Sequence, residues 1–352
     1  MRRRNFLKYS VGLSLASFLP LGVFSQGIDV KESLFSRSIA GGGTRILELE
    51  GWNVWCCSPV YGDDGLIHVF FSRWRGGHDN WLKKSEIAHA VAEVPEGPYR
   101  VLGTVLKGQG AGHWDADTIH NPTIHKVGDR YLLYYIGNNL KHANKNHAHH
   151  ASTQRIGLAV SNSLYGPWER VGNDGMILGT SNNKRDWDSY LTTNPALLHH
   201  PGGQLWLYYK AWDFNNDNLR KMGIAFADVP EGPYRKYEGN PVISFSSINA
   251  QVEDAYVWFQ DGTYHMVMRD MGVCNERSGL YMNSLDGLKW SEPMLAYKES
   301  THYFPDEPLN RFERPQVLMK DGKATHLFLA LMGGRFNTSS GAVLKIDGSV
   351  FR

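Results

Sequence analysis

The feature that most constrains the fold of this chain is an internal repeat with a period of about 60 to 70 residues. A polar loop, a short apolar strand, a turn rich in Gly and Asp, and an aromatic-rich strand occur five times. The positions that align with a proline are 59, 122, 195, 255 and 315. Each unit alone would expose an apolar face, so the units must stack on one another to bury it.

A second pattern follows the first four copies and supplies further strands. It consists of an apolar strand, a Gly-Pro-aromatic turn and another strand, as at Gly97-Pro98-Tyr99, Gly166-Pro167-Trp168 and Gly232-Pro233-Tyr234. The fourth copy, Leu288-Lys289-Trp290, is degenerate. No segment shows a sustained helical period. Five units of about four strands predict an all-β, five-bladed β-propeller, and two stacked sandwiches are the less regular alternative.

The fifth unit ends one strand short, near residues 342–346. The stretch 44–49 has the alternation of a strand and precedes the first unit. We therefore expect the N-terminal stretch to complete the last blade and to close the ring.

The first 25 residues have the pattern of a targeting signal rather than of a folded segment. Arg3-Arg4-Asn5-Phe6-Leu7-Lys8 precedes an apolar run at 11–24, and the region contains no acid. This pattern predicts a twin-arginine export signal over 1–25, a five-bladed propeller catalytic domain over 26–352, and a periplasmic or secreted protein. An uncleaved anchor is the alternative.

The net positive charge of the chain comes from this N-terminal segment. The sequence has 37 Lys and Arg against 35 Asp and Glu, and four of the bases lie within the first nine residues. The remainder is slightly acidic, which argues against a nucleic-acid partner. After signal removal we expect a monomer without membrane contact. The three cysteines, Cys56, Cys57 and Cys274, have no metal-ligand or disulfide spacing and are expected to be buried thiols.

Candidate site residues open the inner strands. In a propeller these strands line the axis, so the polar residues at their starts converge on one mouth. The converging residues are Cys57, Ser58, His120, Asn121, Asn194, Glu253, Asp254, Glu313 and Arg314. Two carboxylates in different blades can face one another there, as acid–base chemistry on a sugar requires. We expect Glu253 and Glu313 to be catalytic.

Further candidates lie on second strands and in upstream loops. Arg73, Lys210 and Arg269 end second strands, where they bind an acidic group of a substrate or form structural ion pairs. The loops add Trp114, Asp117, Trp187 and Tyr190. Trp and Tyr stack on sugar faces, and packing between blades is the alternative for each Trp.

One loop is rich in histidine. His142, His147, His149 and His150 fit a metal-binding loop or a solvated lid, and the absence of acidic or Cys partners at set spacing favours the lid. No cofactor is predicted, and the sequence leaves open whether a metal ion lies on the axis.

The five-unit pattern resembles the propellers of glycoside hydrolase family 43 and its relatives, families 32 and 117. Such enzymes resemble one another in an Asp-Pro that opens blade one as the base, a second Asp that orients, and a Glu that opens a later blade as the acid. Glu253 matches the acid position. The base position reads Cys57-Ser58-Pro59 and the orienting position Asn121 or Asn194, so Asp117 or Glu313 replaces the base or the reaction differs.

A different reaction fits the polar residues. β-Elimination at a uronic acid needs a His, Tyr or Lys base and cationic or amide partners for the enediolate. His120, Tyr190 and Lys210 supply the first set, and Asn121, Asn194, Arg73 and Arg269 the second. The chain is also similar to the propeller-type oligosaccharide dehydratases of marine ulvan degradation, which implies loss of water at a non-reducing uronic acid.

The sequence therefore predicts an exported enzyme that acts on the non-reducing end of acidic, ulvan-type oligosaccharides. The first hypothesis is a dehydratase. The alternatives are an exo-acting hydrolase of the family 43 type, with Glu253 as acid, and a non-catalytic glycan-binding propeller.

Overall fold

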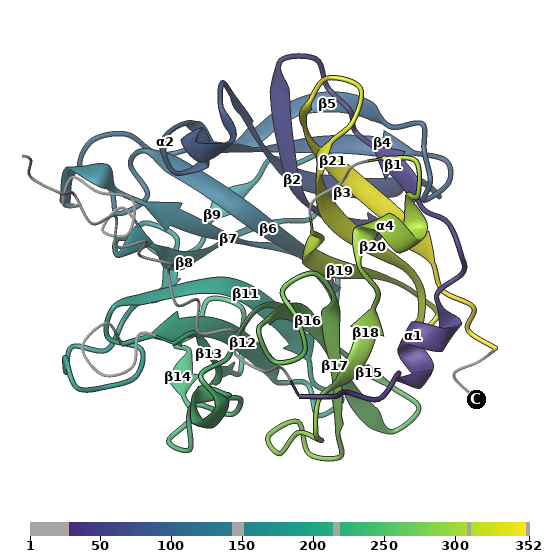
Figure 1. The fold of residues 1–352 in the computed structure, drawn as a ribbon. Helices are drawn as coiled ribbons and strands as arrows, with labels where there is room; N and C mark the ends of the chain where they lie inside the picture. Colours follow the sequence, from purple (N-terminus) through teal and green to yellow (C-terminus); the bar gives the residue numbers. More distant parts are fainter. Residues whose placement is uncertain (1–27, 143–150, 214–218, 308–310, 350–352) are drawn as a thin grey trace, which may run out of the picture.

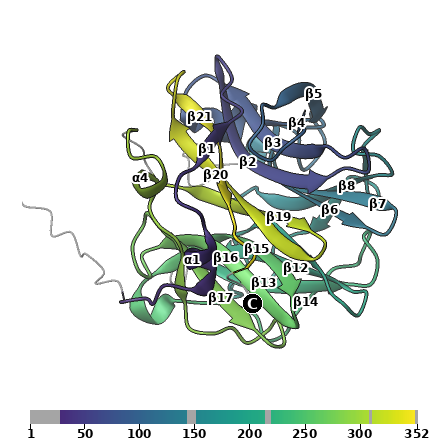
Figure 2. The ribbon, with the colours of Figure 1, turned by 90° about the vertical axis from the view of Figure 1, so that its right-hand side faces the viewer.

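Five antiparallel sheets stand in a ring (Figures 1 and 2), and the first strand of each repeated unit lies innermost. The computed structural model describes residues 28–142, 151–213, 219–307 and 311–349. The inner strands are β2 (Trp52–Tyr61), β6 (Thr118–Val127), β11 (Leu191–His199), β15 (Gln251–Gln260) and β19 (Glu313–Lys320). They touch in this order, and β19 touches β2 again, which closes a ring of five. The predicted five-bladed β-propeller is confirmed.

The blades follow the chain order. Blade one contains β2 (Trp52–Tyr61), β3 (Ile67–Arg75), β4 (Glu86–Ala92) and β5 (Arg100–Leu106). Blade two contains β6 (Thr118–Val127), β7 (Arg130–Asn138), β8 (Arg155–Ser161) and β10 (Met176–Leu178), with β9 (Glu169–Arg170) also on β8. Blade three contains β11 (Leu191–His199), β12 (Leu205–Trp212), β13 (Lys221–Ala227) and β14 (Arg235–Lys236).

The last two blades complete the ring. Blade four contains β15 (Gln251–Gln260), β16 (Thr263–Met271), β17 (Gly279–Ser284) and β18 (Met294–Tyr297). Blade five contains β19 (Glu313–Lys320), β20 (Lys323–Gly333), β21 (Thr338–Lys345) and β1 (Thr44–Ile46). The helical segments are short: α1 (Leu34–Ser38), η1 (His78–Asn80), α2 (Trp81–Lys84), η2 (Leu140–His142), η3 (Ser246–Ile248) and α4 (Ser300–Tyr303).

The N-terminal strand closes the ring. β1 pairs antiparallel with β21, with Ile46 opposite Gly341, and Figure 1 shows the purple strand beside the yellow one. Ile46 is buried, and Gly341 leaves room for it: a Cβ at Gly341 would lie 2.7 Å from the Ile46 side chain. The expectation that residues 44–49 supply the missing strand is confirmed for 44–46.

The blades pack through aromatic residues on both faces of their second strands. Tyr134 and Tyr135 on β7 are fully buried, and Tyr208 and Tyr209 occupy equivalent places on β12. Successive residues of a strand point to opposite faces, so each pair contacts both neighbouring blades. This burial of aromatic surface provides a large part of the apolar contribution to stability.

Every inner strand carries a β-bulge at the same level. The pairing register shifts there in all five blades. The bulge residue has a left-handed backbone, with φ between 53° and 64°, in Cys56, Asn121, Asn194, Asp254 and Arg314. Because the bulge aligns the blades, the blade-one equivalent of Asn121 is Cys56, and the sequence-based alignment on Ser58 and Pro59 was wrong by two residues.

The predicted signal at 1–25 lies outside the described residues. Within the described ranges, no helix has the length and apolar character needed to cross a membrane.

Removal of residues 1–49 tests the closure of the ring. It deletes β1 and leaves β21 as an open edge that can pair with another chain. We expect the melting temperature to fall by more than about 10 °C and the protein to associate as its concentration rises. Circular dichroism and size-exclusion chromatography measure the two effects. A chain lacking only residues 1–27 keeps β1 and is the control; equal melting temperatures would contradict the role of β1.

Candidate active site

A cavity of about 590 Å³ opens at the level of the bulges and receives side chains from all five blades. Its lining includes the bulge residues Asn121, Asn194, Asp254 and Arg314, and the residue that precedes the bulge in each of the five blades. Because the bulge residue and its predecessor both lie at the axial end of an inner strand, the cavity forms where the sequence predicted the mouth.

Hydrogen bonds at the level of the bulges link blades to one another. Asn194 of blade three and Arg314 of blade five both donate to Asp254 of blade four, the arginine over 2.8 Å. The Arg314 Nε also donates to the Cys56 sulfur at 3.3 Å, and the Cys56 thiol donates to the Pro122 carbonyl at 3.2 Å. We call this series of bonds the axial chain. It connects all five blades, and none of its bonds runs directly between blades two and three.

Glu253 lies above the axial chain and is surrounded by cations. Lys210 Nζ lies 2.6 Å from one carboxylate oxygen and Arg220 Nε 3.3 Å from the same oxygen, while Arg269 contacts the other. Burial alone would raise the pKa of Glu253, but Lys210, Arg269 and Arg220 together bring that pKa well below its ordinary value. Glu253 is therefore ionised across the physiological range.

Glu313 occupies the equivalent position in the next blade and has the opposite tendency. Arg269 lies 3.2 Å and Arg311 2.8 Å from its Oε1. Burial raises the pKa of Glu313, and the nearby charges of Glu253 and Asp254 add to this while Arg269 and Arg311 oppose it. Two neighbouring carboxyl groups whose pKa values are driven apart are the arrangement that acid–base catalysis uses.

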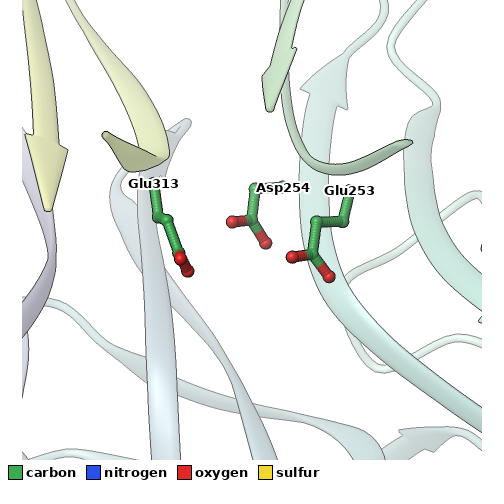
Figure 3. A group of neighbouring side chains, drawn as sticks. All are labelled: Glu253, Asp254 and Glu313. Atoms are coloured by element: carbon green, nitrogen blue, oxygen red, sulfur yellow. The ribbon is translucent and has the colours of Figure 1, made fainter. Parts of the chain in front are cut away.

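Three carboxylates converge in this region. Figure 3 shows Glu253 and Asp254 on one strand and Glu313 on another, pointing into the same space, and one oxygen from each lies within 4.8 Å of the others. Each carboxylate already contacts a cation: Lys210 and Arg269 for Glu253, Arg269 for Glu313 and Arg314 for Asp254. These side chains would have to move before a divalent metal could bind, so the donor set does not fit an axial metal.

His120 and Tyr190 both reach the cavity. The His120 Nε2 lies 2.8 Å from the amide nitrogen of Gln154, while its Nδ1 has no hydrogen-bond partner among the described residues. Burial, with smaller contributions from Arg314 and Lys210, lowers the pKa of His120 to about 3. The ring is therefore neutral at pH 7. Tyr190 is half-buried against Trp212, and burial raises its pKa.

Aromatic side chains cover the opposite side of the cavity. Trp55 precedes the bulge of blade one, Trp74 is the penultimate residue of β3, and Trp81 begins α2. His78 packs between Trp55 and Trp74, with ring centroids 5.2 Å and 5.7 Å away. We call Trp55, Trp74 and Trp81 the aromatic wall, and the side chains of Lys210, Arg220, Glu253, Arg269, Arg311 and Glu313 the charged wall.

Six residues that were expected at the mouth lie outside the lining: Cys57, Ser58, Arg73, Trp114, Asp117 and Trp187. Trp114 stacks on Tyr135 and Trp187 on Tyr209, at 5.9 Å and 5.5 Å between ring centroids, so both tryptophans pack within the blades as the alternative interpretation expected.

Asp117 is exposed, and its carboxylate accepts from the backbone N–H of Leu140, so it stabilises a loop and does not replace a base.

Arg73 lies outside the cavity because successive residues of a strand point to opposite faces of the sheet. Ser72 is the β3 residue opposite Trp55, so it faces the cavity, and Arg73 points to the other face. There Arg73 pairs with Glu86 at 2.9 Å and lies over the Trp52 ring. Arg73 and Glu86 therefore form a structural ion pair. Lys210 and Arg269, at the positions equivalent to Ser72, do reach the cavity.

Several lining residues escaped the sequence analysis. The aromatic wall, Trp212, Arg220 and Arg311 are the main ones. Trp55 could have been found once blade one was aligned on Cys56, since it then occupies the position of Glu253 and Glu313. Arg220 and Arg311 come from connections without a repeated pattern, so no sequence signal marks them. The His-rich loop lies outside the described residues at 143–150, and nothing is described of the His142 side chain.

Comparison with known proteins supports the architecture. No protein-family model matches the sequence, and no curated protein matches it. Among solved structures, the chain is similar to a family 117 glycoside hydrolase of the marine bacterium Zobellia galactanivorans, with a TM-score of 0.67, 16% identity, and coverage of 90% of this chain and 92% of that one.

Two other solved structures show the same likeness. One is a GH43_1 enzyme from Xanthomonas citri complexed with xylotriose, with a TM-score of 0.58, 14% identity, and coverage of 89% of this chain and 92% of that one. The other is an endo-arabinase from Bacteroides thetaiotaomicron, with a TM-score of 0.56, 12% identity, and coverage of 87% and 98%. The resemblance inferred from the sequence is thus confirmed at the level of the fold.

Arg314→Met tests the axial chain. The substitution leaves the buried Asp254 carboxylate without its cation, so we expect the free energy of unfolding to fall by about 3–5 kcal/mol. Urea unfolding measures this. Arg235→Met removes an exposed partner of Asp228 and should cost less than about 1 kcal/mol. A loss in Arg314→Met no larger than in Arg235→Met would contradict the structural role of the chain.

The charge of Glu253 predicts how stability depends on pH. Its pKa is lower in the folded protein than in the unfolded chain, so its contribution is complete above the unfolded value of about 4.3 and is lost as the pH falls toward the folded value. Between about pH 5 and pH 3, Glu253→Gln should therefore lose less stability than the parent protein. Unfolding at stepped pH measures the slopes. Glu299→Gln, at an exposed site, should keep the parent slope; the same slope in Glu253→Gln would refute the assignment.

Proposed function

We propose that this protein is a carbohydrate-active enzyme that acts on the terminal sugar of a glycan, and that hydrolysis is the reaction its carboxyl groups support best. The observation that carries the proposal is the pair Glu253 and Glu313, which open adjacent inner strands and have opposite pKa shifts in one cavity. The likeness to a family 117 hydrolase and to a GH43_1 enzyme bound to xylotriose supports a sugar as the ligand.

In this proposal Glu313 is the general acid. Its raised pKa favours the protonated form, which can donate to the glycosidic oxygen as the bond breaks. The resemblance to family 43 implied Glu253 as the acid, but Lys210, Arg220 and Arg269 oppose its protonation. Glu253 is better suited to stabilise positive charge that develops on the sugar ring.

A hydrolase also needs a base that activates water, and the bulge position of blade one does not supply it. The bulge position of blade one holds Cys56, a thiol whose pKa burial raises, so it does not act as a base at neutral pH. Asp79 on η1 is the one exposed carboxylate among the described lining residues and is our candidate for activating water.

A second candidate, elimination of water from a terminal uronic acid, rests on the missing carboxylate in blade one and on the neutral His120 beside it. His120 would take the C5 proton, and Tyr190 would protonate the C4 hydroxyl that leaves as water. Arg269 and Asn121 would stabilise the enediolate. The substrate would be an acidic, ulvan-type oligosaccharide encountered outside the cytoplasm, as the predicted export signal requires.

Mass spectrometry separates the candidates. Neutral and uronic-acid oligosaccharides are incubated with the purified protein. Release of a terminal monosaccharide supports hydrolysis. Loss of one water without chain cleavage, together with new ultraviolet absorbance, supports elimination. Binding without any product supports a non-catalytic glycan-binding propeller and refutes both enzyme proposals.

Glu313→Gln tests the acid. We expect the glutamine variant to lose roughly 100- to 10,000-fold in kcat, because it cannot donate a proton. In the parent protein kcat/KM should fall at high pH as Glu313 ionises, and the raised pKa places this fall above the ordinary range of a glutamate. Glu299→Gln is the matched control and should keep full activity. Turnover in Glu313→Gln close to that of the control would remove Glu313 from the mechanism.

A further inference from the structure

The charged wall contains more positive than negative charge. Glu253 and Glu313 share four cations: Lys210, Arg220, Arg269 and Arg311. Asp254 and Arg314 form a separate buried pair below them. Asp79 adds one carboxylate from the opposite side, so the described lining residues comprise five cations and four carboxylates. Protonation of Glu313 would increase this excess of positive charge.

The cations differ in how far they are withdrawn from solvent. The side chains of Lys210 and Arg269 are 10% and 7% exposed, whereas those of Arg220 and Arg311 are 30% and 38% exposed. The two inner cations are therefore committed to the carboxylates. The two outer guanidinium groups lie where the charged wall meets solvent.

The outer arginines have related geometries in different blades. Arg220 precedes β13 in blade three, and its Nε lies 3.3 Å from Glu253; Arg311 precedes β19 in blade five, and its Nε lies 2.8 Å from Glu313. A guanidinium has five N–H donors in a planar fork. Arg220 also donates from Nη1 to the Gln251 side-chain oxygen at 2.6 Å, and the 30% and 38% exposure of Arg220 and Arg311 makes part of each side chain accessible to an anion. Arg220 also stacks over Trp212 at 5.0 Å, which fixes its plane.

The remaining surface complements these arginines. The aromatic wall lies on the blade-one side of the cavity, where Trp55 and Trp74 are buried and Trp81 is partly exposed. Trp81 is the member of the wall that a sugar ring can reach. A sugar that stacks there and carries an anionic substituent would satisfy both walls. With a neutral sugar bound, only solvent would stabilise the excess positive charge of the outer arginines.

We propose that Arg220 and Arg311 form a subsite for an anionic substituent on the sugar, a carboxylate or a sulfate ester. This inference rests on the proposed function only in taking the ligand to be a sugar. Both anions present oxygen pairs that a guanidinium binds bidentately. Arg220 and Arg311 thus determine specificity, in addition to the smaller part that they have, beside Lys210 and Arg269, in the protonation of Glu253 and Glu313.

Calorimetric titration with three monosaccharides tests the subsite. Glucuronate and glucose 6-sulfate supply the two anions, and glucose is the neutral match. We expect at least one anion to bind ten-fold or more tightly than glucose at low ionic strength, and this preference to shrink as salt is added. The anion that is preferred identifies the substituent. Equal affinity for the three sugars, or no measurable binding of either anion, would overturn the proposal.

Substitutions assign the effect to the two arginines. Arg220→Gln and Arg311→Gln should each reduce the preference for the anion by roughly ten-fold or more, with little change in the binding of glucose. Arg220→Lys and Arg311→Lys keep the charge without the fork and should retain part of the preference. Arg277→Gln, at a side chain 75% exposed outside the cavity, is the control. An unchanged preference in both glutamine variants would refute the assignment.

Two outcomes separate this inference from the proposed function. Selective binding of an anionic sugar without turnover of any glycan would support the subsite and refute the enzyme. Turnover of neutral glycans with no preference for an anion would do the reverse. If a glutamine variant does not fold, as judged by circular dichroism, the lysine variant and the salt dependence of the parent protein still decide the question.

Discussion

A left-handed residue in every inner strand is the constraint on which the rest of this structure depends. The bulge interrupts the ladder at one level in all five blades and brings polar side chains to the axis. None of the five bulge residues is glycine, so each conformation carries an energetic cost of about 1–2 kcal/mol. The axial chain from Asn194 through Asp254 and Arg314 to Cys56 offsets this cost with bonds between blades.

The same geometry separates two chemically identical groups. Glu253 and Glu313 occupy equivalent positions before a bulge, yet the residue opposite each one differs: Arg269 pairs across from Glu253, and Ala330 from Glu313. Lys210 in the preceding blade then adds a second cation to Glu253 alone. A repeated backbone with unrepeated neighbours is thus sufficient to lower the pKa of one carboxyl group and to raise the pKa of the other.

The sequence predicted the fold more fully than the site because the fold depends on what the blades share. Repeated turns and aromatic strands identified five blades and the closing strand. The carboxylates were also found, since they open inner strands. Trp114 and Trp187 were misassigned because a stacking tryptophan and a packing tryptophan have the same local pattern. The side that Arg73 faces required the register of β3, and Arg220 and Arg311 lie in connections that repeat nowhere.

The pairing of β1 with β21 has a consequence for how the protein acquires its site. Residues 44–46 and 338–345 are distant in the sequence yet lie in one sheet, and the inner strand of that sheet supplies Glu313. Contacts of such wide sequence separation form slowly, because the loop must close before they contribute. During synthesis the last blade, and with it the closed ring that places Glu313 beside Glu253, can therefore form only after residues 338–345 have been made.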